Sequence, residues 1–199
     1  MPEQLRVLFN LAVFSGLRKG EMLALQWSDI NFENSTVSVT KAAAVVDGKQ
    51  VCKAPKTKNS RREVSIPRFL TDRLHNLMIE QTKTKESLGA YWKGNNWLFT
   101  QSDGSMMSYS TPYATFQDAI DRYNADKEPA DQLPHIPFHG LRHTSATLLI
   151  AAHQDVRTVS NRLGHAQAST TMNIYAHALK ENDRTASNAL ENMLCKTGA

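Results

Sequence analysis

The chain has 199 residues, of which 41% are hydrophobic, so its length suits roughly one domain with a sizeable core. Its 23 Lys and Arg residues against 19 Asp and Glu residues give a net charge of +4, a mild tilt towards polyanionic partners. No apolar run reaches the length of a membrane span and the N-terminus lacks the layout of a signal peptide, so we expect a cytoplasmic protein rather than a membrane or secreted one.

Two helices are expected near the N-terminus. Apolar residues recur at helical spacing over residues 3–14, and Gly16 breaks that run. A second helix is expected over residues 21–26. Arg18 precedes this second helix, where a surface arginine is one interpretation. Glu21 follows three residues later, so a local ion pair is a second one, in which the carboxylate could orient the arginine.

Three strand candidates interrupt the helical pattern. Residues 36–40 alternate valine with polar residues, as a half-buried strand does, and residues 45–53 and 62–66 supply two more candidates. Turns are expected at residues 47–48 and 58–60. The expected fold class is therefore α+β, mainly α with a small antiparallel three-stranded β-sheet.

Basic side chains gather around the last two strand candidates. They are Lys53, Lys56, Lys58, Arg61 and Arg62. A charge run of this kind is typical of a solvated sheet edge that contacts only the phosphates of a nucleic-acid backbone. We expect this role for most of the five.

Helices and one long connector follow the strands. Residues 69–81 carry one buried stripe, and residues 82–94 are polar, which indicates a loop or a frayed helix end. Residues 110–123 form a further amphipathic helix. Residues 124–137 contain three prolines and are expected to be a connector that delivers His139.

A group of histidines and an arginine begins with His139. Residues 144–152 are apolar on more than one face and predict a buried helix, with His139, Arg142 and His143 at its start. The unpaired N–H groups and the positive dipole end at such a start favour an anion such as phosphate.

A second, shorter helix is expected next, capped by Asp155 and ended by Gly164. His165 follows at once, and a polar run over residues 166–171 leads to Tyr175. Loop and helix-end positions of this kind converge readily in a folded domain. The stretch from His139 to Tyr175 therefore predicts an active site for phosphodiesters.

A metal site is the competing interpretation of the histidines. His139 and His143 are four residues apart and would share one helix face, and four more lie nearby: His135, His153, His165 and His177. However, no HExxH motif is present and no carboxylate separates the paired histidines. The cysteines, Cys52 and Cys195, fit no metal-ligand spacing and are expected to be free thiols. We therefore expect neither metal nor cofactor.

Four motifs, in this order, resemble those of the tyrosine recombinases of the phage-integrase type. They are GLRKGEMLALQWSDINF at 16–32, KTKNSRREVSIP at 56–67, HGLRH at 139–143, and RLGH at 162–165 with Tyr175 ten residues after its histidine. They resemble the family's first arginine box, its lysine-bearing hairpin, its HxLRH and LGH motifs and its nucleophilic tyrosine. Together they are far more specific than any one motif.

The resemblance implies a metal-free cleavage of DNA. Tyr175 would attack the scissile phosphate, giving a 3′-phosphotyrosyl link that preserves the bond for rejoining. Arg18 and Arg142 would neutralise the phosphorane, because guanidinium presents paired donors that match phosphate oxygens. His139 would accept the proton of Tyr175, and His165 would donate to a phosphate oxygen.

The resemblance also places a general acid in the hairpin, where the family has a lysine that enters the minor groove. Lys56, followed by Thr57, is our assignment for the group that protonates the leaving 5′-oxygen. Lys58 is the alternative, because this hairpin is slightly longer than the family pattern.

The implied organisation is a tyrosine recombinase catalytic domain over residues 1–178. Residues 179–199 would form a C-terminal tail that either docks on a neighbouring subunit or packs on its own subunit as a frayed terminus. The family's N-terminal core-binding domain is expected to be absent from this chain. The implied function is that of a site-specific DNA recombinase or integrase of a mobile element. It would act on double-stranded DNA and assemble as a tetramer on two DNA sites.

Two other functions stay open. Residues 156–175, with their glycine turn, could form a helix-turn-helix module that binds DNA without catalysis. A type IB topoisomerase would share the covalent tyrosine chemistry but would relax supercoils without pairing two sites.

Overall fold

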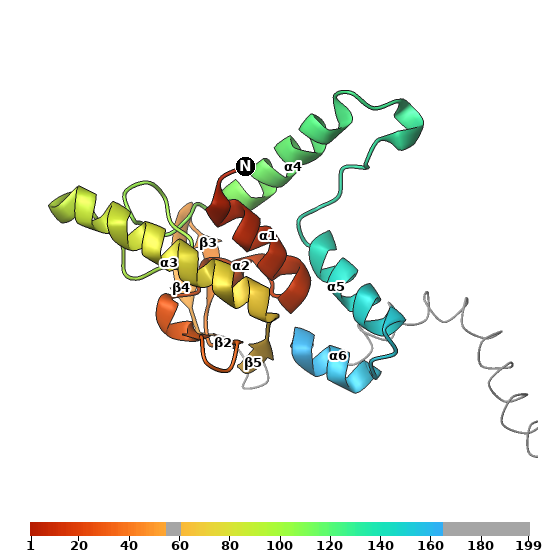
Figure 1. The fold of residues 1–199 in the computed structure, drawn as a ribbon, viewed down its shortest axis with the longest axis horizontal. Helices are drawn as coiled ribbons and strands as arrows, with labels where there is room; N and C mark the ends of the chain where they lie inside the picture. The colour runs from red at the N-terminus through yellow and green to blue at the C-terminus, as the bar shows by residue number, and fades with distance from the viewer. Residues whose placement is uncertain (55–60, 165–199) are drawn as a thin grey trace, which may run out of the picture.

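The computed structural model describes residues 1–54 and 61–164 (Figure 1). In chain order the elements are α1 (Glu3–Ser15), α2 (Lys19–Leu23), η1 (Trp27–Asp29), β1 (Ile30–Asn31), β2 (Thr36–Val39), β3 (Ala42–Val46), β4 (Lys49–Lys53), β5 (Arg62–Ser65), α3 (Arg68–Leu88), η3 (Gly89–Tyr91), α4 (Thr111–Asn124), η4 (Pro129–Asp131), α5 (Gly140–Ala151) and α6 (Val156–Leu163). The expected mainly α fold with small antiparallel sheets is confirmed.

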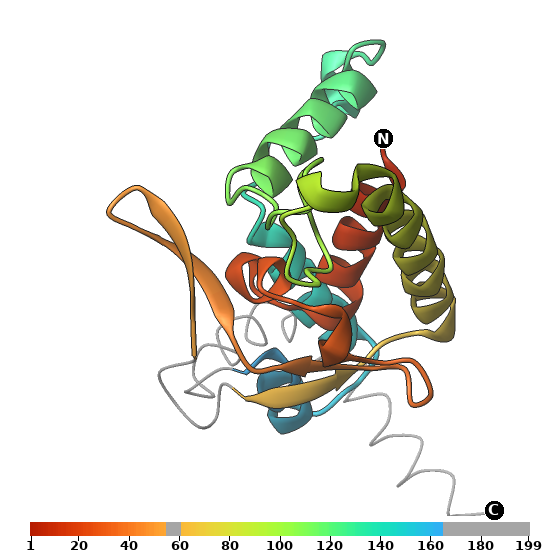
Figure 2. The same cartoon turned by 90° about the vertical axis from the view of Figure 1, so that its left-hand side faces the viewer.

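The strands are divided differently from the expectation. A three-stranded antiparallel sheet has the order β1-β2-β5, while β3 and β4 pair only with each other. The strand candidate over residues 45–53 is divided between β3 and β4. The turn expected at Asp47 and Gly48 is confirmed, because both residues have positive φ and reverse the chain there. Figure 2 shows the resulting β3–β4 hairpin projecting from the body of the domain.

Two of the expected helices are longer than their hydrophobic pattern. α3 continues to Leu88 through residues that were expected to be a loop or a frayed helix end, since these are mostly good helix formers that need no buried stripe. It stops where Gly89 takes a positive φ. α5 begins at Gly140, four residues before the expected start.

The core is built around α1, which packs against both α3 and α5 (Figure 1). Val7, Leu8 and Leu11 of α1 are fully buried, as are Leu70 and Leu74 of α3. Each such leucine contributes roughly 1.5–3 kcal/mol relative to an exposed one. No helix in the described ranges has both the length and the apolar character needed to cross a membrane.

A cluster of three phenylalanines positions the start of α5. Phe9 lies 5.6 Å from Phe116 and 6.0 Å from Phe138 between ring centroids. Phe138 is 5% exposed and directly precedes His139. Packing against α1 and α4 thus fixes the residue before the first histidine of the candidate site.

The ends of α1 and α6 meet. Gly16 closes α1 with φ +64°, and a Cβ on it would lie 2.3 Å from Leu163 Cδ2. Glycine is therefore required at this position both by conformation and by the close approach of α6. This contact brings the C-terminal carbonyls of two helices together beside α2 and α5.

Candidate active site

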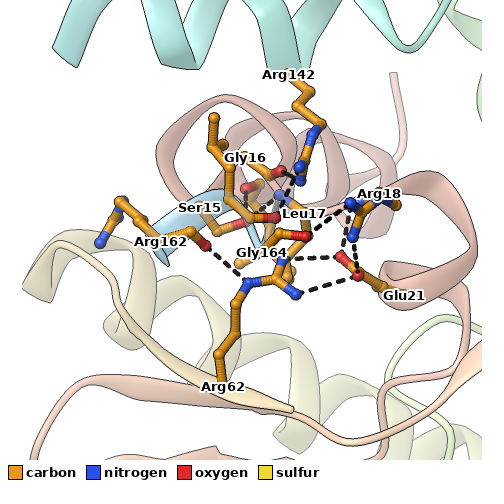
Figure 3. A network of polar contacts seen from close by, with 11 residues as sticks. Ser15, Gly16, Leu17, Arg18, Glu21, Arg62, Arg142, Arg162 and Gly164 are labelled. Carbon is orange, nitrogen blue, oxygen red and sulfur yellow. Dashed lines mark hydrogen bonds and ion pairs between the residues drawn. The ribbon is translucent and has the colours of Figure 1, made fainter. Parts of the chain in front are cut away.

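Arg142 lies between the ends of these two helices (Figure 3). It comes from the first turn of α5 and is 3% exposed. Its Nη1 donates to the carbonyl of Gly16 and its Nη2 to that of Leu163, both at 2.6 Å. The last carbonyls of a helix have no intrahelical partner, and a guanidinium satisfies them while opposing the negative end of the dipole.

Arg18 reaches the same helix end from the start of α2. Its Nη2 donates to the carbonyl of Gly164 at 2.8 Å. Because Arg142 binds the preceding carbonyl, that of Leu163, the two guanidinium groups are held beside one another. The Arg18 side chain is 40% exposed, whereas Arg142 is enclosed.

The ion pair between Arg18 and Glu21, one of the two interpretations of this arginine from the sequence, is present. Arg18 Nη1 lies 2.8 Å from Glu21 Oε1, and the Arg18 backbone N–H donates to Oε2 at 2.9 Å. Burial alone would raise the pKa of the Glu21 carboxyl, but hydrogen bonding and charge from Arg62 and then Arg18 outweigh it and hold this pKa below its ordinary value. Glu21 is therefore a buried carboxylate at neutral pH.

Arg62 belongs to the five basic residues, most of which were expected on a solvated edge, and for Arg62 that interpretation is wrong. It donates to both oxygens of Glu21, from Nη1 at 3.1 Å and from Nη2 at 2.9 Å. Its Nε donates to the carbonyl of Arg162 at 2.7 Å, and its side chain is 7% exposed. A buried carboxylate needs a cation with matched geometry, and a bidentate guanidinium provides it.

Arg162, from the RLGH motif, ties α6 to two other elements. Its Nη2 donates to the carbonyls of Phe14 at 2.7 Å and Ser65 at 2.8 Å, at the ends of α1 and β5. Burial, and then the charge of Arg62, lower its pKa. The Arg162 side chain thus links α6 to the ends of α1 and β5, the elements that surround the site.

The site carries an excess of positive charge. Burial, followed by the charge of Arg18, lowers the pKa of Arg142 to about 9, so its guanidinium stays protonated at neutral pH. Glu21 offsets part of this charge, as the helix-end carbonyls do. An anion between Arg18 and Arg142 would therefore be favoured.

The backbone N–H groups at the start of α5 are not available to an anion, contrary to the expectation from the sequence. The N–H groups of Gly140, Leu141 and Arg142 donate to the carbonyls of residues 137, 138 and 139. They were expected to be unpaired, but the tight turn that leads into the helix satisfies them. The anion-binding character of this region thus comes from side chains.

His139 lies at this same turn, exposed to solvent. The part of its ring that is covered by neighbouring atoms is desolvated, and this, followed by the charges of His143, Arg142 and Arg18, lowers its pKa below the ordinary value. Its ring meets that of His143 edge to face at 5.1 Å between centroids. A lowered pKa leaves the His139 imidazole neutral at pH 7, in the form that accepts a proton.

A groove runs from His139 to the β3–β4 hairpin. One pocket of about 410 Å³ is lined by Arg18, Lys19, Gly20, Tyr109, Tyr113, Pro137, Phe138 and His139. A second, also about 410 Å³, shares Lys19, Tyr109 and Tyr113 with it and extends to Val45, Gly48 and Gln50 of the hairpin. The Nζ of Lys19 lies 3.9 Å above the Tyr109 ring. Sequence patterns gave no sign of this groove, because its residues come from separate elements.

The structure therefore brings together Arg18, His139 and Arg142 of the predicted site. Lys56, His165 and Tyr175 lie outside the described residues, as do Lys58 and the tail over residues 179–199. Within residues 1–54 and 61–164, no three His, Cys, Asp or Glu side chains are grouped so that they could hold a metal ion.

Solved structures share this fold. The Tn1549 transposon integrase, in complex with transposon right end DNA, superposes with a TM-score of 0.77 at 23% identity, covering 95% of this chain and 58% of that one. The XerH site-specific recombinase bound to its difH substrate has a TM-score of 0.63 at 27% identity, covering 90% of this chain and 44% of that one.

Sequence relatives are named as recombinases and integrases too. A tyrosine recombinase XerC-like protein of Caldanaerobacter subterraneus subsp. tengcongensis is 32% identical over 96% of this chain and 50% of the relative. The ICEBs1 integrase of Bacillus subtilis is 32% identical over 95% of this chain and 49% of its own length. The chain thus spans about half the length of these curated relatives. The model of the phage integrase family matches residues 1–182, and because that match extends over most of the chain, the chain belongs to this family, the tyrosine recombinases that its motifs resemble.

Proposed function

We propose that this chain is the catalytic part of a site-specific DNA recombinase or integrase that cuts and rejoins DNA through a 3′-phosphotyrosyl intermediate. One observation carries the proposal: Arg18 and Arg142 converge on the consecutive carbonyls of Gly164 and Leu163. Two guanidinium groups held in this way suit the non-bridging oxygens of one phosphate. The relatives named as integrases and recombinases support the same reaction.

The arginines would act on the charge that develops in the transition state. Nucleophilic attack on the phosphate concentrates negative charge on its non-bridging oxygens, and preorganised donors stabilise it without rearrangement. Arg18 is the more exposed of the pair and keeps N–H groups for the phosphate. Arg142 is buried with its charge intact and holds the helix ends that frame the site.

Proton transfer is assigned to the remaining motif residues. Neutral His139 would accept the proton of Tyr175, whose Oη forms the bond to phosphorus as the bond to the 5′-oxygen breaks. Lys56, or alternatively Lys58, would give its proton to that 5′-oxygen, and His165 would donate to a non-bridging oxygen. The positions of these residues in the family motifs support this part of the proposal.

Double-stranded DNA is the proposed substrate. The Tn1549 integrase and XerH structures each contain DNA, and the groove beside Arg18 and His139 gives this chain a path for it. We further propose that residues 1–178 form the catalytic domain and that residues 179–199 dock on a neighbouring subunit. The assembly would be a tetramer on two DNA sites in the cytoplasm.

A denaturing gel tests the reaction. Wild-type protein incubated with a labelled suicide substrate, in which a nick prevents rejoining, should form a covalent protein–DNA adduct. Tyr175→Phe should bind the same DNA with similar affinity and form no adduct, because only the nucleophilic oxygen is lost.

The other outcomes are equally informative. An adduct formed by Tyr175→Phe would assign the nucleophile to another residue. DNA binding by wild type with no adduct would favour the helix-turn-helix alternative. An adduct together with relaxation of plasmids that carry a single site would favour the topoisomerase.

A further inference from the structure

Arg62 connects two parts of the site that are far apart in the sequence. Its terminal nitrogens bind Glu21, which pairs with Arg18, while its Nε binds the carbonyl of Arg162 near the end of α6. A Cβ on Gly164 would lie 2.8 Å from Arg62 Nη1, so the guanidinium packs directly against the residue before His165.

The geometry at Glu21 makes Arg18 depend on Arg62. Glu21 Oε1 accepts from Nη1 of both arginines, at 2.8 Å from Arg18 and 3.1 Å from Arg62. Glu21 Oε2 accepts from the Arg18 backbone and from Arg62 Nη2, both at 2.9 Å. The bidentate contact fixes the plane of the carboxylate, and this plane sets the direction in which Arg18 points.

Arg18 needs such support more than Arg142 does. Arg142 is enclosed and held by two backbone carbonyls, whereas the Arg18 side chain is 40% exposed and has Glu21 and the Gly164 carbonyl as its partners among the described residues. A long, exposed side chain has many rotamers, so its orientation costs entropy unless its partners are rigid.

We propose that Arg62 is a positioning residue for strand cleavage: it holds Glu21 so that Arg18 faces the scissile phosphate, and it fixes the end of α6 relative to that arginine. This rests on the proposed function. The Arg62 side chain is 7% exposed and donates to Glu21 and Arg162 within the described residues, so it would act through Arg18 and not on DNA. A lysine could not replace it, because an ammonium lacks the planar fork.

Arg162 supplies a matched control. It is a half-buried arginine that also holds α6, but it binds the carbonyls of Phe14 and Ser65 and not Glu21. We compare Arg62→Lys with Arg162→Lys in single-turnover adduct formation at saturating DNA, below both melting temperatures. Arg62→Lys should slow adduct formation by up to about 10²-fold with little change in DNA affinity, since small misplacements of a catalytic group have effects of that size.

A purely structural ion pair gives a different result. Both variants would then lose melting temperature and rate in parallel, and an Arg62→Lys rate no lower than that of Arg162→Lys overturns the proposal. If Arg62→Lys does not fold, Glu21→Asp replaces it in the comparison, because the shorter carboxylate cannot hold both arginines.

The substrate provides a second readout. A methylphosphonate at the scissile position removes the negative charge that Arg18 would neutralise, so the loss caused by Arg62→Lys should shrink on one of its two diastereomers. A loss of the same size on all substrates would assign Arg62 to folding alone. If neither the wild type nor any variant forms an adduct, the proposed function itself is wrong. This outcome differs from every result that overturns the role of Arg62.

Discussion

Glu21 is the carboxylate around which the arginines of the site are arranged. Arg18 and Arg62 share its two oxygens, and its charge also raises the pKa of Arg142 against the effect of burial. Removing one partner of such a buried group leaves an uncompensated charge, which typically costs about 3–5 kcal/mol. The carboxylate and the arginines therefore stabilise one another at a site proposed to bind an anion.

His139 allows a prediction from pH. Its pKa lies below the ordinary 6.5, chiefly because of burial and the charge of His143. If neutral His139 accepts the proton of Tyr175, the rate of adduct formation should rise with pH through this lowered pKa and then level off. In His143→Ala the lowering charge is gone, so the pKa of His139 rises and the acidic limb of the pH–rate profile should move to higher pH.

The control for this prediction is His153→Asn. His153 has φ +58°, which asparagine tolerates, and it does not contribute to the shift of His139. Its profile should match that of the wild type. A limb that stays in place in His143→Ala would show that a group other than His139 sets it.

Single residues also show where the sequence was sufficient. The Arg18–Glu21 pair was predicted from a spacing of three residues, because such a pair is local. The burial of Arg62 was missed, although alternation along β5 places it on the same face as Val64, which is 1% exposed. The charge of the neighbouring run concealed that signal, since the partner, Glu21, belongs to a distant element.

At the scale of elements, the meeting of helix ends shapes the site. Gly164 ends α6 with φ +66°, and its carbonyl and missing Cβ serve Arg18 and Arg62 respectively. The sequence predicted glycine as a helix terminator here and at Gly16. It could not show that the two ends face each other, because that depends on how α1, α5 and α6 pack.

Gly164→Ala tests whether glycine is needed here for its positive φ alone or also for the space that the Arg62 guanidinium occupies. Alanine must adopt a left-handed conformation, at a cost of roughly 1–2 kcal/mol, and its Cβ must also displace the Arg62 guanidinium. Gly48→Ala in the hairpin turn is the matched control, with φ +73° and open space around it. Denaturant unfolding should show a larger loss of stability for Gly164→Ala than for Gly48→Ala, and Gly164→Ala should slow adduct formation at saturating DNA. Equal losses of stability in the two variants would mean that the Arg62 side chain moves away from the new Cβ at little cost.

The strands show what local patterns could not resolve. β3 contains three alanines, which have low strand propensity, so residues 42–44 gave no strand signal. They are strand because β4 pairs with them through the turn at Asp47 and Gly48. Pairing partners decide such segments, and these are visible only in the fold.

At the scale of the whole molecule, the groove lies between the β3–β4 hairpin and the start of α4, and ends at His139. Figure 2 shows the hairpin and α4 extending from the same body in different directions. Gln50 of β4 connects the hairpin to the segment before α4, because it donates to the Met107 carbonyl at 2.9 Å and accepts from the Tyr109 N–H at 2.8 Å. DNA lying here would have one phosphate at Arg18 and a neighbouring one near Lys19.

Lys19 is the residue that tests this path. Burial lowers the pKa of Lys19. Its Nζ lies over the Tyr109 ring, and this cation–π contact holds the ammonium group at the groove wall. If it meets a phosphate, Lys19→Gln should weaken DNA binding and reduce the slope of log K against log salt concentration by about one, the value expected for one lost phosphate contact. Lys19→Arg should keep the slope, because it keeps the charge. Lys93→Gln should also keep it, since Lys93 pairs with Asp103 and lines neither pocket of the groove. An unchanged slope in Lys19→Gln would place the DNA away from this groove and leave Lys19 as packing for Tyr109.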